Sequence, residues 1–167
     1  NASGQAKDVV AHGKVQITFW YSGGKTAAGV MDDIIDGFNQ AQDQYQVTGI
    51  RQEDYDGTYT KLQAGIAGNN AADIALLDSD KSRSLMQKDL LVPMDAYTQQ
   101  DTSFHQDDFI PVFYNQCLDN NKILYAMPAY GTTQVMYYNR ELFEKAGIRP
   151  EGLDTWERLA DAARVIK

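Results

Sequence analysis

The chain has 167 residues, and its 23 aspartates and glutamates outnumber its 15 lysines and arginines to give a net charge of −8. This charge excludes nucleic acid as a favoured partner, because no cluster of basic residues offsets the repulsion from phosphates. A hydrophobic content of 43% supports a packed core. Cys117 is the only cysteine, so an internal disulfide and a cysteine metal cage are both excluded.

The opening of the chain, NASGQAKDVVAHGK, is polar and small, and we expect residues 1–14 to form a flexible leader. It lacks the apolar region of a signal peptide and fits a mature chain from which a targeting segment has been removed. No apolar run approaches the roughly 18 residues that a membrane-spanning helix needs.

Strand and helix patterns then alternate. Val15–Tyr21 is a β-branched and aromatic run, typical of a buried strand, and it stops at Ser22-Gly23-Gly24. Apolar residues at helical spacing between Val30 and Ala41 predict an amphipathic helix after this turn. Tyr45–Ile50 predicts a second strand.

A second helix and a third strand follow. Tyr59, Leu62 and Ile66 share one face of the predicted helix, which ends at residues 68–70 (Gly-Asn-Asn). Asp73–Leu77 is short and mostly apolar, as expected of a strand buried on both faces, and a third helix is predicted over residues 82–88. This order indicates an α/β fold with a mostly parallel sheet, flanked by helices and joined by right-handed crossovers.

The patterns after residue 94 are weaker. Residues 95–108 predict a polar loop, and Phe109–Leu118 predicts a helix with Pro111 in its first turn. Ile123–Pro128 and Gln134–Asn139 predict two further strands, and Arg140–Ala146 a short helix. Asp154 or Thr155 is expected to cap a last helix with an apolar face made of Trp156, Leu159, Ala163 and Ile166.

The end of the first strand is a candidate ligand-binding site. Ligands of parallel sheets bind at the carboxyl ends of strands, where Trp20, Tyr21, Ser22 and Gly23 stand. Successive strand side chains point to opposite faces, so the two rings cannot both fill one core, and we expect Trp20 or Tyr21 to touch a ligand. A phosphate-binding P-loop is excluded, because Phe19 occupies the position of its first glycine.

Asp78-Ser79-Asp80 follows the third predicted strand at the same edge, and three interpretations stay open. Ser79 or Asp80 could cap the next helix, Asp78 could accept hydrogen bonds from ligand hydroxyls, or two carboxylates could hold a divalent ion. The last interpretation corresponds to an alternative function, a small Mg²⁺-dependent phosphoacceptor or hydrolase domain using Asp78 and Asp80. Receiver-like domains place paired acids at the end of the first strand, where this chain has aromatic residues, which counts against that alternative.

Other catalytic and metal-binding chemistry has little support. His12 and His105 have no partner His or Cys at ligand spacing and no candidate nucleophile beside them, so we expect no metal, no cofactor and no catalytic residue. Tyrosine occurs ten times, and tyrosines at strand ends or in turns, such as Tyr55 and Tyr130, could stack on a sugar ring.

Four segments give the chain a family resemblance. They are ITFWYSGG with the helix ending FNQAQDQYQV; YTKLQAGIAGNNAADIALLD; LLVPMDAY; and LYAMPAYGTTQVMYYNRELFEKAGI followed by TWERLADAA. The chain resembles, over residues 15–167, the N-terminal part of the extracellular solute-binding proteins of bacterial ABC importers. That family includes the maltose- and glycerol-3-phosphate-binding proteins.

The resemblance implies a type II periplasmic-binding-protein fold, in which two α/β lobes close on a ligand without performing a reaction. Residues 15–128 would form most of the first lobe, residues 129–133 a hinge, and residues 134–167 the truncated start of the second lobe. The ligand would be a sugar, an oligosaccharide or a sugar-phosphate-like solute, delivered to the permease subunits of an importer. The protein would work outside the cytoplasm, either lipid-anchored or free in a periplasm.

The resemblance also implies which residues contact the ligand. Several glycerol-phosphate binders of the family carry His in place of Tyr21 and an acidic residue soon after Gly23. This chain has Lys25 there, which leaves a sugar or oligosaccharide open as the ligand. The implied contacts are Tyr21, Ser22, Gly23, Tyr55, Tyr59, Asp78, Tyr130 and Gly131.

Overall fold

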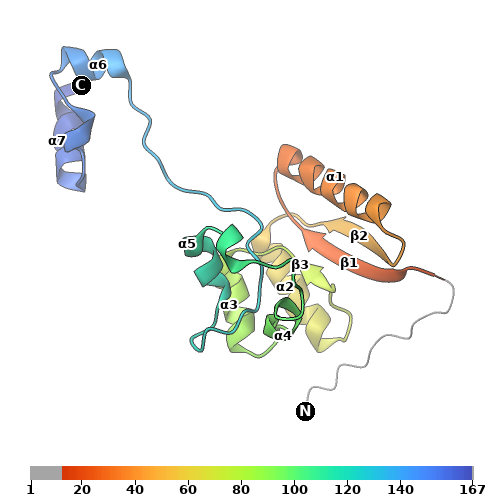
Figure 1. Ribbon diagram of the computed structural model, residues 1–167. Helices are drawn as coiled ribbons and strands as arrows, with labels where there is room; N and C mark the ends of the chain where they lie inside the picture. Colours follow the sequence, from red (N-terminus) through yellow and green to blue (C-terminus); the bar gives the residue numbers. More distant parts are fainter. Residues whose placement is uncertain (1–12, 167) are drawn as a thin grey trace. The chain divides into compact units, whose positions relative to one another are not determined.

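The computed structural model describes residues 13–166, so nearly all of the predicted leader lies outside the described residues. The chain separates into two compact units, Asn1–Tyr130 and Gly131–Lys167 (Figure 1). Their boundary falls inside residues 129–133; that this segment acts as a hinge stays a prediction. Within the described part, no helix is long and apolar enough to cross a membrane.

The first unit is built on a parallel sheet with the strand order β2-β1-β3. β1 (Val15–Tyr21) pairs along its whole length with β2 (Tyr45–Arg51), while β3 (Ile74–Ala75) pairs only with Phe19 and Trp20. The register sets Tyr21 opposite Arg51 and Trp20 opposite Ala75, so the carboxyl ends of all three strands meet at one edge. The predicted α/β fold with a parallel sheet is confirmed.

Helices cover both faces of this sheet. Figure 1 shows α1 (Lys25–Ala41) along one face of β1 and β2, with α2 (Tyr55–Ala67) and α3 (Ser79–Gln87) on the other side. Each helix begins a few residues earlier than its apolar pattern predicted, directly after the turn that leaves the strand. The apolar stripe of α1 is wider than its contact with the sheet: Ile35 is buried, while Ile34 is 58% exposed.

The rest of the first unit corrects two predictions. The predicted loop contains α4 (Asp95–Thr98) and a 3₁₀ turn, η1 (Gln106–Asp108), and the predicted helix after it is split into α5 (Pro111–Tyr114) and η2 (Asn115–Cys117).

The predicted strand over residues 123–128 is wrong and is reduced to one bridge, Leu118 to Leu124. The physical reason is that the backbone of Leu124 is satisfied elsewhere. Its N–H donates to the Asp95 carboxylate (2.8 Å), and its carbonyl accepts from Met94 N (2.7 Å).

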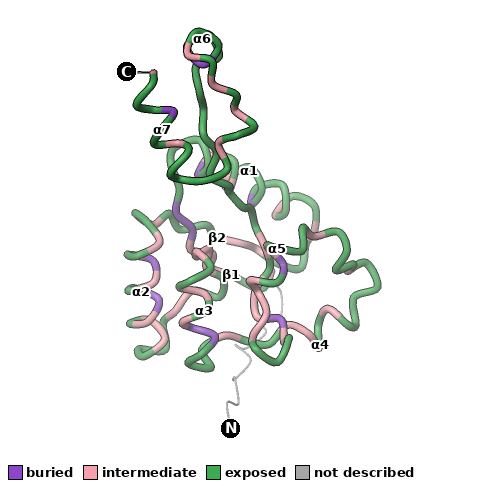
Figure 2. The backbone as a smooth tube through the Cα atoms, turned by 90° about the vertical axis from the view of Figure 1, so that its left-hand side faces the viewer, coloured by how far each residue is buried: buried purple, intermediate pink, exposed green. Residues whose placement is uncertain are grey.

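The second unit consists of α6 (Arg140–Lys145), a 3₁₀ turn η3 (Pro150–Gly152) and α7 (Trp156–Ile166). The predicted strand over residues 134–139 is wrong, because this extended segment finds no ladder partner among residues 13–166 and every residue of it is exposed. The buried residues of these helices are Phe143 on α6 and Ala162 on α7, in the purple parts of the tube in Figure 2.

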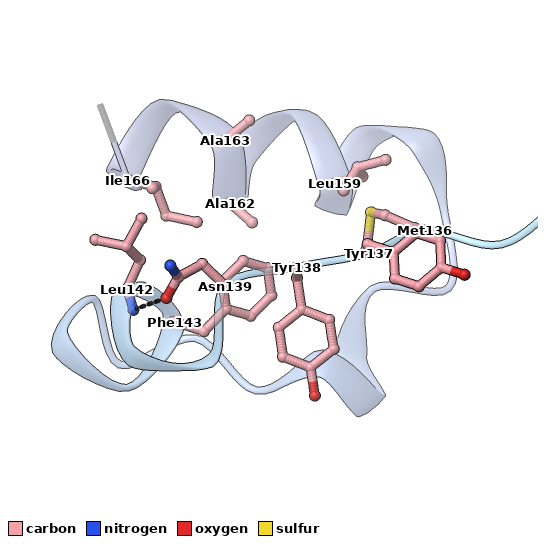
Figure 3. A pocket seen from close by; sticks show the side chains of 10 residues that line it. All are labelled: Met136, Tyr137, Tyr138, Asn139, Leu142, Phe143, Leu159, Ala162, Ala163 and Ile166. Carbon is pink, nitrogen blue, oxygen red and sulfur yellow. Dashed lines mark hydrogen bonds between the residues drawn. The ribbon is translucent and has the colours of Figure 1, made fainter.

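The two helices of this unit line a small apolar pocket. Its volume is about 240 Å³, and Figure 3 shows side chains of α7 facing those of α6 and of the segment before it. The rings of Tyr138 and Phe143 stack at 4.6 Å on one side of it. Of the predicted apolar face, Leu159, Ala163 and Ile166 line the pocket, but Trp156 does not and is 83% exposed.

Candidate functional site

The turn after β1 supplies the first part of the candidate site. Tyr21 and Ser22 are buried at 2% and 6% exposure, whereas Gly23 and Gly24 are exposed. Gly23 has a φ of 159°, and a Cβ there would lie 3.1 Å from Cβ of Ala27, so the turn into α1 is tight. The Ser22 hydroxyl makes no hydrogen bond to any other described residue, which leaves it able to donate to a ligand.

Tyr21 points into the core beneath α1. Its ring packs against Phe19 at 5.5 Å and belongs to a cluster with Ala28 and Ile35. Its hydroxyl donates to the carboxylate of Asp32 on α1, which also pairs with Arg51 at the end of β2. Burial and the Asp32 carboxylate raise the pKa of Tyr21. In this structure Tyr21 therefore supports the turn from below, while Trp20, half-buried on the opposite face of β1, lies outside that cluster.

Sequence reasoning missed Asp32 and Arg51. The Tyr21 hydroxyl and the Arg51 guanidinium lower the pKa of Asp32, so the three groups form a network that joins β1, α1 and β2. The sequence could have indicated such a partner, because the hydroxyl of a tyrosine buried in a core usually needs a hydrogen-bonding group.

The start of α2 brings Tyr55 to the same edge. Asp54 caps the helix by accepting from Gly57 N at 2.7 Å, and Thr58 behind it is fully buried. The capped start fixes Tyr55 at the first position of α2, and its hydroxyl is hydrogen-bonded to that of Tyr130. Burial, this bond and the nearby Asp78 carboxylate raise the pKa of Tyr55 to about 12, so it remains a neutral phenol at pH 7.

Asp78 has the capping role, while its hydrogen bonding to a ligand stays a prediction. It caps α3 itself, in place of the predicted Ser79 or Asp80, by accepting from Lys81 N at 2.9 Å. Its second carboxylate oxygen accepts from Lys81 Nζ at 2.7 Å, and that ammonium also pairs with Asp56 at 2.8 Å. Burial alone would raise the pKa of Asp78, but the Lys81 bonds prevail and lower it. Asp78 is therefore an ionised carboxylate that remains partly exposed and can accept further bonds.

Tyr59 and Gly131 lie apart from these groups. The Tyr59 hydroxyl is hydrogen-bonded to Ser84 at 2.7 Å and accepts from Lys88 Nζ at 3.2 Å, so it ties α2 to α3. These two bonds lower the pKa of Tyr59. Gly131 is exposed and begins the second unit. Direct ligand contact by either residue stays a prediction.

The assembled groups can bind polar molecules but offer little chemistry. Tyr55, Tyr130 and Ser22 supply neutral hydroxyls, and Asp78 supplies a carboxylate. Among the residues that the structure describes, no group of three or more His, Cys, Asp or Glu could hold a metal ion. The arrangement therefore suits recognition of hydroxyl-bearing solutes.

Comparison with known proteins gives the family. The model of the bacterial extracellular solute-binding protein family matches residues 24–167. The sn-glycerol-3-phosphate-binding periplasmic protein UgpB of Yersinia pestis is 30% identical over 158 residues, which cover 90% of this chain and 35% of UgpB.

Two solved structures share the fold. The sugar-binding protein MalE of Xanthomonas citri has a TM-score of 0.76 at 22% identity, over 92% of this chain and 38% of MalE. UgpB of Mycobacterium tuberculosis in complex with glycerophosphocholine has a TM-score of 0.71 at 21% identity, over 93% of this chain and 39% of that protein. The chain thus spans little more than a third of these relatives, and it belongs to the non-enzymatic family of bacterial extracellular solute-binding proteins.

Proposed function

We propose that this chain forms one wall of a clamp-type binding site for a sugar, an oligosaccharide or a sugar-phosphate-like solute, which the intact protein delivers to the permease of an ABC importer. The observation that carries the proposal is the convergence of Tyr55, Tyr130 and Asp78 at the carboxyl edge of the first unit's sheet. Neutral phenols and a carboxylate match the donors and acceptors of a sugar's hydroxyls, and ring faces can stack on its apolar side.

The relatives support the same class of solute. The names of the similar proteins refer to a sugar, to sn-glycerol 3-phosphate and to glycerophosphocholine. Each of these molecules carries hydroxyls on neighbouring carbons. The relatives named periplasmic suggest that this protein, too, works outside the cytoplasm, either free or held by a lipid anchor.

Thermal-shift measurements on the full-length protein test the proposal. Maltotriose, mannotriose, sn-glycerol 3-phosphate and glycerophosphocholine are added separately, with sodium sulfate and an amino-acid mixture as controls. A solute present at about a hundred times its Kd should stabilise the protein by about 2.7 kcal/mol. Stabilisation by the amino acids, and by none of the hydroxylated solutes, would contradict the proposal.

A further inference from the structure

One hydrogen bond ties the end of the first unit to the start of α2. Between Ala126 and Tyr138, the hydroxyl bond from Tyr130 to Tyr55 is the single hydrogen bond that the segment makes to any described residue. Tyr130 is 58% exposed, so little burial holds its ring in place. The pairing of these two hydroxyls is therefore a feature of the surface at the candidate site, not a consequence of core packing.

The paired hydroxyls retain capacity for further bonds. A phenol can donate one hydrogen bond and accept others, and the mutual bond uses one donor and one acceptor. The pair therefore still offers one O–H and lone pairs on both oxygens. The remaining partners must approach two oxygens that are hydrogen-bonded to each other.

A vicinal diol, two hydroxyls on neighbouring carbons, has the matching shape. In the gauche arrangement its oxygens are separated by roughly 2.8 Å, about the length of an O–H···O bond. Each diol hydroxyl can meet one phenol oxygen, so two new hydrogen bonds join the bond between the phenols. A neutral diol also suits the charges at this place. Tyr55 stays protonated and uncharged at neutral pH, and the neighbouring Lys81 is paired with Asp56 and Asp78.

We propose that Tyr55 and Tyr130 form a clamp for one vicinal diol of the solute. The clamp rests on the proposed function, and it adds the functional group that this edge of the sheet selects. Sugars and glycerol both contain this group, so the proposal applies to either source, and the experiment must separate the two.

Calorimetric titration of the full-length protein tests the clamp. The variants are Tyr55→Phe, Tyr130→Phe and the double variant, with Tyr97→Phe as a matched control, because Tyr97 on α4 is 67% exposed and makes no side-chain hydrogen bond to a described residue. The sugar arm uses maltotriose and mannotriose with their monodeoxy derivatives. The glycerol arm uses sn-glycerol 3-phosphate with 3-hydroxypropyl phosphate, which lacks the middle hydroxyl.

The clamp predicts a specific pattern of affinities. Each single variant should bind the preferred solute about five- to tenfold more weakly, and the double variant scarcely more weakly than either, because both changes break one shared unit. The wild type should prefer the intact diol over its deoxy analogue about tenfold, and Tyr130→Phe should lose this preference. Tyr97→Phe should bind as the wild type does.

Three other results would overturn the clamp. If the wild type binds a solute and both single variants bind it as tightly as the wild type does, the clamp is wrong and the proposed function stands. If Tyr130→Phe weakens binding but keeps the preference for the diol, Tyr130 only supports the fold. If no solute of either arm binds the wild type, the proposed function fails and the clamp fails with it.

Discussion

Gly49 on β2 is expected to be intolerant of any side chain, because the core beside the candidate site fills the space above it. A Cβ at this position would lie 2.7 Å from Cδ1 of Ile35 and 2.8 Å from Cε1 of Tyr21. Favourable carbon–carbon contacts lie at about 3.5–4.0 Å, so both neighbours would have to move. The Ile35 methyl is the end of a flexible side chain, but the Tyr21 ring is tied through its hydroxyl to Asp32.

We therefore predict that Gly49→Ala destabilises the protein. Overpacking of a core costs about 1–3 kcal/mol, and replacing a strand glycine by alanine returns about 0.5–1 kcal/mol of backbone entropy. The net loss in the free energy of unfolding should be about 0.5–2 kcal/mol. Ile35→Val removes the Cδ1 atom, so in the double variant the two losses should be less than additive by about 0.5–1 kcal/mol.

Urea unfolding of the full-length protein, followed by circular dichroism, measures these changes. Gly29→Ala is the matched control, since nothing lies within 4 Å of its added Cβ and α1 should gain up to about 1 kcal/mol. The reasoning is refuted if Gly49→Ala is as stable as the wild type, or if Ile35→Val does not reduce its cost.

Three further predictions follow from the site. Tyrosine absorbance measured against pH should show Tyr55 titrating with a pKa of about 12. Because this pKa is raised in the folded protein, the stability that the protonated Tyr55 contributes should be complete below pH 10 and disappear as the pH rises from 10 to 12. The Tyr21 hydroxyl and the Arg51 guanidinium lower the pKa of Asp32, so the protein should lose stability as the pH falls below 3.8, the ordinary pKa of an aspartate. In Asp32→Asn, the free energy of unfolding should change less with pH over this acid range. Trp20→Ala should weaken solute binding by about 1–3 kcal/mol in calorimetry, and unchanged affinity would show that Trp20 does not contact the solute.

Local patterns predicted β1 and β2 well and the later strands badly. β3 is shorter than the predicted Asp73–Leu77, and as an edge strand it leaves Ile74 49% exposed instead of buried on both faces. β1 has the predicted bounds and β2 gains one residue, because alternation and β-branched content act within each strand. The predicted strand over residues 123–128 failed for a non-local reason. Which groups satisfy the backbone of Leu124 depends on Asp95 and Met94, 29 and 30 residues earlier in the chain, and no periodicity encodes that choice.

In the candidate site, too, the sequence predicted local features and missed those that depend on contacts between distant residues. Strand alternation correctly separated Trp20 from Tyr21, but it could not say which ring α1 would cover. That choice depends on Asp32, whose carboxylate receives the Tyr21 hydroxyl. The cap of α3 was misassigned because the helix begins at Ser79 and its predicted start lay three residues later, which moves the capping position to Asp78.

The proposed recognition of hydroxyls agrees with the pairing of two cations near the sheet edge. Arg51 is paired with Asp32, and Lys81 is shared between Asp56 and Asp78, so neither cation is left to attract a phosphate. Carboxylates also cap the starts of α2 and α3, each accepting from one backbone N–H, whereas the start of α1 carries no side-chain cap. The edge also carries the paired phenols of Tyr55 and Tyr130 and the partly exposed carboxylate of Asp78. Such groups offer a phosphate little, while a neutral polyol can both donate to them and accept from them.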